Sequence, residues 1–198
     1  MKKYYSIIAI NKDNKIIDFI NNINNQTINS EEIEIIIETT KLPTSIKQSI
    51  NNKNVIIREH KNYDISKMYN DGLKIASGKY INFTNTTVLY QKDTTLNKIK
   101  ELNKYNIITT SIIFNNTITN NVSKYIFSNE VNELIDLKKD KENINLSLES
   151  YFVNHKLLKN ISFDTKFGIE SPIKLIIDIF NKNSKRYNPN LEKCSPVL

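Results

Sequence analysis

The stretch DISKMYNDGLKIASGKYINF, residues 64–83, predicts a helix followed directly by a strand. Its apolar side chains recur at spacings of three and four, the helical period, at Ile65, Met68, Tyr69, Leu73 and Ala76. Asp64 is placed to cap this helix, over residues 64–77, and Gly78 to end it. Gly72 lies on the apolar face and lets a neighbouring strand approach closely. Residues 79–83 then predict a strand, which makes the segment one α–β unit.

The same alternation extends outward from this unit. Further strands are predicted at residues 4–10, 33–37, 55–57 and 107–114. Helices are predicted at residues 13–26, at residues 94–104 and after Pro43. Strands and helices that alternate in this way predict an α/β fold with a mostly parallel sheet and helices on both faces. Ligands of such sheets bind at the carboxyl ends of the strands, so the loops after residues 10, 37 and 83 are the candidates.

The second half of the chain has a less regular pattern. Residues 118–127 predict a hairpin about Asn120-Asn121, and a short helix is expected near Val131 and Leu134. Ser171 and Pro172 are typical of an N-cap and a first helical turn. No internal repeat or linker divides the chain, so we expect a single domain over residues 1–198, with halves at 1–114 and 115–198.

Composition excludes several classes of protein. The 198 residues are 39% hydrophobic and 25% charged, which is typical of a globular protein, and no apolar run approaches the length of a membrane span. Three glycines cannot build the glycine-rich loops of dinucleotide-binding or P-loop proteins. One cysteine, Cys194, excludes a disulfide framework, and two histidines argue against a multi-histidine metal site. The N-terminus does not read as a signal peptide, so we expect a cytoplasmic protein, with the inner face of the membrane included.

Several short segments, in order, resemble the family-two glycosyltransferases, which are inverting enzymes with the GT-A fold. The matching segments are residues 6–8, Asn25-Gln26-Thr27, residues 34–38, residues 69–73 with 76–83, residues 161–164 and residues 167–170. The resemblance covers residues 4–90 well and residues 150–180 loosely. It implies that residues 1–114 bind a nucleotide sugar and that the short half at 115–198 faces the acceptor.

The resemblance also implies a set of site residues. Glu38 would contact the nucleobase or ribose, and Asn70, Thr84 and Thr86 would complete the nucleotide-sugar site. The family holds a divalent metal, Mg²⁺ or Mn²⁺, with a D-x-D motif after the fourth strand, but this chain has Thr84-Asn85-Thr86 there and no metal-ligating carboxylate. The family's catalytic base is the aspartate of an E-D pair, which here is Glu170-Ser171, so the remaining glutamate is the candidate base.

Three functions stay open at this point. The first is transfer of a sugar, with inversion, from a nucleoside-diphosphate sugar to an acceptor hydroxyl, as in polysaccharide biosynthesis; Lys67, Lys79 or Lys92 could then replace the charge of the metal. The second is a catalytically inactive relative that serves as a binding module for a protein partner. The third is nucleic-acid binding through the net charge of +7, for which no interleaved aromatic and basic motif is present.

Overall fold

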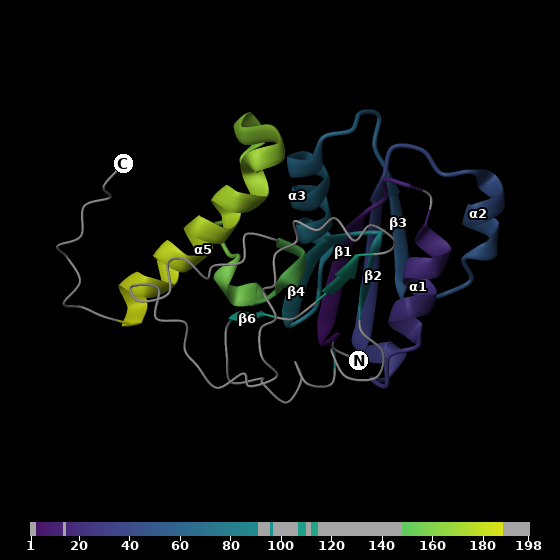
Figure 1. Cartoon of the computed structure of the whole chain (residues 1–198), viewed down its shortest axis with the longest axis horizontal. Coiled ribbons are helices and arrows are strands. Elements are labelled where there is room, and N and C mark those ends of the chain that lie inside the picture. Colours follow the sequence, from purple (N-terminus) through teal and green to yellow (C-terminus); the bar gives the residue numbers. More distant parts are fainter. Residues whose placement is uncertain are drawn as a thin grey trace.

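The computed structural model describes residues 3–13, 15–90, 96, 107–109, 112–114 and 148–187. Its centre is a six-stranded sheet in the order β3-β2-β1-β4-β8-β6 (Figure 1). The strands are β1 Tyr5–Ile10, β2 Ile33–Thr39, β3 Val55–Glu59, β4 Tyr80–Asn85, β6 Ile107–Thr109 and β8 Tyr151–Asn154. Strands β1 to β4 are parallel, and β8 runs antiparallel to both β4 and β6. The prediction of a mostly parallel α/β sheet is therefore confirmed.

Helices cover both faces of this sheet. Helix α1 (Ile16–Asn24) packs on one face and α3 (Ile65–Ile75) on the other, while α2 (Thr44–Ser49) lies beyond α1 in Figure 1. Helix α5 (Ser171–Tyr187) joins the α3 side. The short 3-10 turns are η1 Ser30–Glu32, η3 Leu148–Ser150, η4 His155–Leu157 and η5 Thr165–Glu170.

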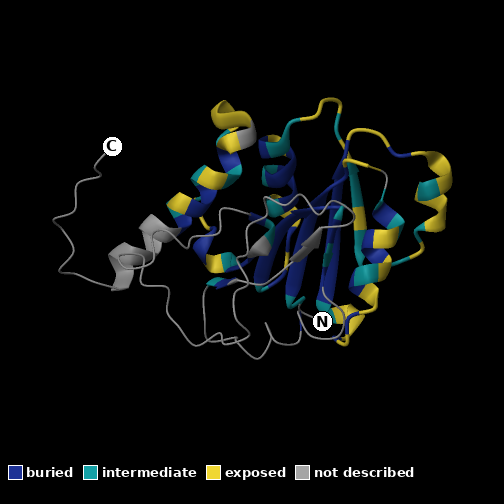
Figure 2. Ribbon diagram, in the orientation of Figure 1, coloured by how far each residue is buried: buried dark blue, intermediate teal, exposed yellow. Residues whose placement is uncertain are grey.

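Two apolar layers hold the sheet between the helices. Alternate residues of β1 contribute to each layer: Ile7 packs with the α1 side, whereas Ile8 packs with the α3 side. All six residues of β1 and all seven of β2 are buried, as the dark colouring of the sheet in Figure 2 shows. Strands buried on both faces in this way are typical of the centre of a parallel sheet.

The unit that decides the fold is confirmed in most details. Asp64 caps α3, since its carboxylate accepts a hydrogen bond from the Lys67 backbone N–H at 2.9 Å. A Cβ on Gly72 would lie 2.5 Å from Ile8 Cγ2, so the close approach of helix and strand requires glycine. The role predicted for Gly78 is wrong: α3 ends at Ile75, and a Cβ on Gly78 would instead collide with the backbone of Ser6 at 2.5 Å.

Other boundaries differ from the sequence-based expectation. The strand predicted at residues 107–114 is two short strands in separate sheets: β6 pairs with β8, while β7 (Ile112–Phe114) pairs with β5 (Val88–Tyr90). Ser171 is not an N-cap, because its backbone is helical (φ −54°, ψ −36°) and its buried hydroxyl has no hydrogen-bond partner among the described residues. The helix predicted at 94–104 lies outside the described residues except for Leu96, and the hairpin at 118–127 and the helix near Val131 lie wholly outside them.

Candidate functional site

The order of the strands defines one switch point at the carboxyl edge of the sheet. From β1 the chain proceeds to β2 and β3 on one side and then returns to place β4 on the other side of β1. Such a reversal leaves a crevice outside the carboxyl ends of the two strands that flank it, which is where open α/β sheets bind ligands. In this sheet the two flanking strands are β1 and β4, which end at Ile10 and Asn85, a pair in register.

A small polar cluster links the strand ends at this switch point. The Asn11 amide donates to Thr39 Oγ1 (3.1 Å), and the Thr86 hydroxyl donates to Asn11 Oδ1 (3.3 Å). The Thr86 backbone N–H also donates to the Ile10 carbonyl (3.1 Å). All three polar residues are buried, so they form a fixed polar floor at the reversal point. Sequence reasoning selected Thr86 but missed Asn11 and Thr39, although their positions just after β1 and at the end of β2 were a usable signal.

The end of β4 lies beside a carboxylate from the second half of the chain. The Asn85 amide donates to Glu149 Oε1 at 3.2 Å. Glu149 is held by its backbone as well, because the Asn82 amide donates to the carbonyls of Glu149 (2.9 Å) and Tyr151 (2.8 Å). Asn85 and Glu149 are 64 residues apart in sequence, and no motif around Glu149 predicts the contact. Sequence reasoning therefore missed Glu149.

Thr84 lies on the other face of the sheet. Phe83 packs on the α3 side, so strand alternation directs the Thr84 side chain towards the α1 side, where Tyr80 and Tyr90 lie. The Thr84 backbone carbonyl accepts a hydrogen bond from the Tyr69 hydroxyl (2.7 Å). The Thr84 hydroxyl is thus directed into the protein interior and away from Glu38.

Glu38 lies under α3 in a buried charged cluster. Its side chain is 0% exposed, and Oε2 is hydrogen-bonded to His60 Nε2. Arg58 Nε is 3.8 Å from Oε1, and a Cβ on Gly72 would lie only 3.0 Å from the same atom. Burial raises the pKa of Glu38, although the hydrogen bond from His60 and the charge of Arg58 oppose that rise. The carboxylate therefore serves as a buried partner for His60, and a nucleoside could reach it only if this cluster opened.

Asp71 belongs to the same charged cluster and is more exposed than Glu38. Its carboxylate binds Lys67 Nζ (2.6 Å) and Lys74 Nζ (2.7 Å), and these two hydrogen bonds lower the pKa of Asp71 to about 2. His60 Nδ1 lies 4.0 Å from Asp71 Oδ2, so the imidazole stands between two carboxylates. This arrangement fixes the loop that follows β3 against α3.

Asn70 makes a reciprocal clasp with backbone. Its amide donates to the Phe163 carbonyl, and its carbonyl oxygen accepts from the Phe163 N–H, both at 2.8 Å. Phe163 in turn packs against Tyr69 and Phe83, with ring centroids 4.8 Å away in each pair. Asn70 thus joins α3 to the segment before η5.

The four residues predicted to bind the nucleotide sugar do not share one described cleft. Glu38 and Asn70 lie on the α3 face, Thr84 is directed to the opposite face, and Thr86 lies in the polar floor. Glu170, the candidate base, is exposed at the junction of η5 and α5.

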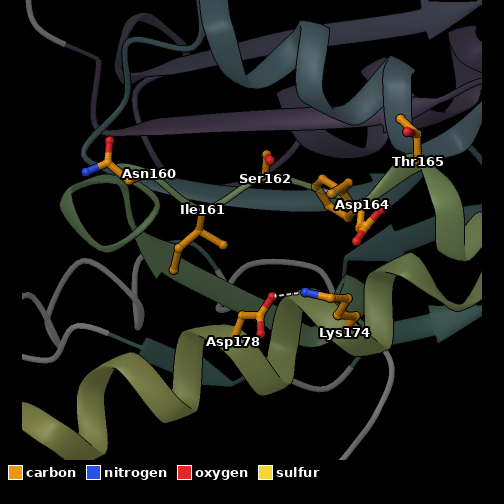
Figure 3. A pocket seen from close by; sticks show the side chains of 8 residues that line it. Asn160, Ile161, Ser162, Asp164, Thr165, Lys174 and Asp178 are labelled. Atoms are coloured by element: carbon orange, nitrogen blue, oxygen red, sulfur yellow. Dashed lines mark hydrogen bonds and ion pairs between the residues drawn. The ribbon is translucent and has the colours of Figure 1, made fainter.

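A separate hollow of about 590 Å³ lies on the α3 side of the molecule. Residues 160–165 form one wall, and Lys174 and Asp178 of α5 form the other (Figure 3). Lys174 and Asp178 form an ion pair of 2.6 Å with each other. The described lining of this hollow contains none of the predicted site residues.

The oxygen atoms available at the end of β4 determine which metal ion could bind there. The described residues contain no group of three or more histidine, cysteine, aspartate or glutamate side chains placed to bind one ion. Asn85 Oδ1 accepts from the backbone N–H and the hydroxyl of Thr87, and the Thr86 hydroxyl is engaged with Asn11. The threonines and Asn85 alone therefore do not fit a divalent cation. With Glu149 the set gains one carboxylate, which fits a Mg²⁺-like ion that takes its other ligands from water and substrate phosphates.

The lysines considered as substitutes for a metal are placed elsewhere. Lys67 pairs with Asp71, and Lys79 stands over the rings of Tyr4 and Tyr80 at the opposite edge of the sheet, 5.4 and 5.2 Å from the ring centroids. Lys92 lies outside the described residues.

The fold defined by this sheet and its helices is that of GT-A-type glycosyltransferases. S. aureus TarS 1-349 in complex with UDP superposes with a TM-score of 0.70 at 16% identity, over 90% of this chain and 55% of that one. The mannosyltransferase PcManGT from Pyrobaculum calidifontis gives 0.59 at 13% identity, over 90% and 52%. The resemblance deduced from the sequence is thus confirmed at the level of the fold.

In sequence, the chain is similar to part of the minor teichoic acid biosynthesis protein GgaB of Bacillus subtilis (strain 168), with 28% identity over 179 residues. The match covers 84% of this chain and 19% of GgaB, so the chain spans about a fifth of that relative and about half of the TarS chain. No protein-family model matches the sequence. In the part of the chain that the structure describes, no helix has the length and apolar character needed to cross a bilayer.

Proposed function

We propose that this chain is a glycosyltransferase that moves a sugar from a nucleoside-diphosphate sugar to an acceptor hydroxyl with inversion. The observation that carries the proposal is the reversal of strand order between β1 and β4, with the polar floor of Asn11, Thr39 and Thr86 at the strand ends. Proteins of similar fold were crystallised with UDP, with UDP-GlcNAc and with GDP-Man and Mn²⁺, which supports a nucleotide sugar as the ligand class.

The proposed reaction is a single displacement at the anomeric carbon. The acceptor oxygen forms a bond to that carbon on the face opposite the diphosphate, the bond from the carbon to the diphosphate oxygen breaks, and the acceptor proton passes to a carboxylate. Glu170 is the proposed base because its exposed carboxylate can accept this proton, whereas the buried Ser171 hydroxyl cannot. A divalent metal, when bound, would neutralise the charge that develops on the leaving diphosphate.

The class of acceptor follows from the sequence relative. GgaB is described as a protein of minor teichoic acid biosynthesis, so we propose a hydroxyl-bearing cell-surface polymer as the acceptor. Assaying transfer from radiolabelled UDP-sugars and GDP-sugars to polyol-phosphate polymers tests this choice. Transfer to such polymers but not to free monosaccharides is the expected result, and the reverse preference would contradict it.

Donor binding can be measured by calorimetry with UDP, GDP, UDP-GlcNAc and GDP-Man, each with Mn²⁺ and with EDTA. We expect at least one of them to bind and ADP to bind more weakly. Thr86→Val removes the hydroxyl that donates to Asn11 while keeping the side-chain volume, and it should weaken donor binding about fivefold, because the Asn11 side chain at the strand ends loses the hydrogen bond that orients it. Thr44→Val, at the exposed start of α2, is the matched control and should bind normally.

Glu170→Gln separates binding from catalysis. The variant should keep the donor affinity of the wild type and lose most transfer, because glutamine cannot accept the acceptor proton. If Glu170→Gln transfers sugar at the wild-type rate, Glu170 is not the base.

A catalytically inactive binding module is the second candidate function. It is favoured by the missing carboxylates at Thr84-Asn85-Thr86 and by the engagement of Glu38 and Asn70 in buried contacts within the protein. Tight donor binding with neither transfer nor donor hydrolysis would support this alternative. Turnover by the wild type would reject it.

A further inference from the structure

The end of β4 has lost the carboxylates expected from the resemblance, but one carboxylate returns there from a distant part of the chain. Strands β4 and β8 pair antiparallel, with Asn82 opposite Phe152. The pairing ends there, because residues 148–150 form η3 immediately before β8, and this turn brings the Glu149 side chain to Asn85, whose amide donates to it at 3.2 Å. Glu149 therefore lies beside the carboxyl end of β4.

The backbone around Glu149 is rigidly held. The buried Asn82 amide donates to the carbonyls on both sides of Ser150, and Asn82 Oδ1 accepts from the Tyr90 hydroxyl at 2.5 Å. A side chain that is fixed at its backbone and oriented at its carboxylate loses little further freedom when it binds a ligand. The negative charge of Glu149 also acts on a neighbouring side chain. Burial raises the pKa of Tyr69, and repulsion from the Glu149 carboxylate adds to that rise.

We propose that Glu149 is the metal-anchoring carboxylate of this chain, and that it holds a divalent cation only together with the diphosphate of a bound nucleotide. The inference rests on the proposed function. One carboxylate and neutral oxygens do not suffice to strip a hard cation of its water, whereas one carboxylate plus two substrate phosphates is a common Mg²⁺ environment. The site is thus assembled from both halves of the chain and completed by the substrate.

The experiment compares nucleotide affinity with and without metal. Calorimetric titrations of UDP and GDP into the full chain, with 1:1 Mn²⁺ or with EDTA, give a metal enhancement ratio for each protein. For the wild type we expect Mn²⁺ to tighten binding by about tenfold or more, and for Glu149→Gln we expect the ratio to fall below about twofold. Metal titrated alone should bind weakly to both.

Glu31→Gln is the matched control, because it makes the same chemical change in η1, before the amino end of β2, where Glu31 pairs with Lys53. It should keep the wild-type ratio. Thermal melting of each variant verifies folding. If Glu149→Gln fails to fold, Glu149→Asp keeps the charge on a shorter side chain and should show a ratio between those of the wild type and a protein without metal response.

The outcomes separate this inference from the proposed function. If nucleotides bind but Mn²⁺ does not change their affinity, or if Glu149→Gln keeps the full metal enhancement, the role of Glu149 is overturned while donor binding stands. If no nucleotide binds in any condition, the proposed function fails and this inference fails with it.

Discussion

Replacing Asn70 by alanine tests whether this residue contacts the nucleotide, as the resemblance implies, or holds the protein together, as its contacts indicate. The substitution removes both hydrogen bonds to the Phe163 backbone. It leaves that N–H and carbonyl without their partners in a partly buried position, between α3 and the segment that leads into η5. Because the Phe163 ring packs on Tyr69 and Phe83, loosening this segment also weakens an aromatic cluster of the core.

The size of the effect follows from these contacts. Two neutral hydrogen bonds contribute about 1 kcal/mol each, and the unpaired backbone groups add about 1 kcal/mol. Alanine has a higher helix propensity than asparagine, and this difference offsets roughly 0.5 kcal/mol of the loss. The expected loss of unfolding free energy is therefore about 2.5 kcal/mol, which lowers the melting temperature of a chain of this size by about 5–10 °C.

The assay is urea and thermal unfolding of the wild type, Asn70→Ala, Asn70→Asp and Asn21→Ala. Aspartate keeps the acceptor for the Phe163 N–H but loses the donor, so it should show roughly half the loss. Asn21 is exposed on α1, so its replacement should leave stability unchanged or slightly higher. Nucleotide affinity, measured on folded protein, should stay at the wild-type value in all four. Wild-type stability of Asn70→Ala together with weakened nucleotide binding would refute the reasoning and restore Asn70 as a ligand contact.

Three further predictions concern the same side of the sheet. Gly72→Ala forces a methyl group to 2.5 Å from Ile8 Cγ2 and should destabilise the protein by about 1–3 kcal/mol in urea unfolding, despite the helix propensity of alanine; unchanged stability would mean that α3 shifts freely. Ion pairing lowers the pKa of Asp71 from 3.8 to about 2, so its contribution is present above pH 3.8 and is lost as the pH falls towards 2. The unfolding free energy of Asp71→Asn should not show this decrease at low pH, which amounts to about 1 kcal/mol in the wild type after screening of the exposed lysines. An equal decrease in the wild type and the variant would contradict the prediction. Asn85→Asp places a second carboxylate beside Glu149, and should lower the melting temperature in EDTA and raise it on addition of Mn²⁺ and nucleotide; indifference to metal would count against the site.

Asparagine has a structural role in this chain that its abundance in the sequence hid. Asn22 repeats the clasp of Asn70: its amide donates to the Tyr90 carbonyl (3.0 Å), and its oxygen accepts from the Tyr90 N–H (2.7 Å). In both cases a helix side chain pairs with the N–H and C=O of one residue, as a neighbouring strand would. A primary carboxamide supplies both a donor and an acceptor, which is why asparagine can do this.

The first half of the fold was predictable because its signals are local. Apolar runs of five to seven residues identified β1 and β2, and the spacing of Met68 and Tyr69 with their neighbours identified α3. The short strand β8 was not predicted, because a four-residue strand with antiparallel partners leaves no period to detect. For the same reason the pattern of residues 107–114 predicts one strand, where the structure has β6 and β7.

The sequence by itself determined the alternation of strands and helices, and with it a parallel sheet whose carboxyl edge is the place for a ligand, because these features follow from the periodicity of neighbouring residues. Only the tertiary structure decided which side chains reach that edge. Burial under α3 turned Glu38 towards His60, strand alternation directed Thr84 to the opposite face, and the pairing of β4 with β8 brought Glu149 to Asn85. Contacts across 22 to 64 residues depend on register and packing, which no local pattern encodes.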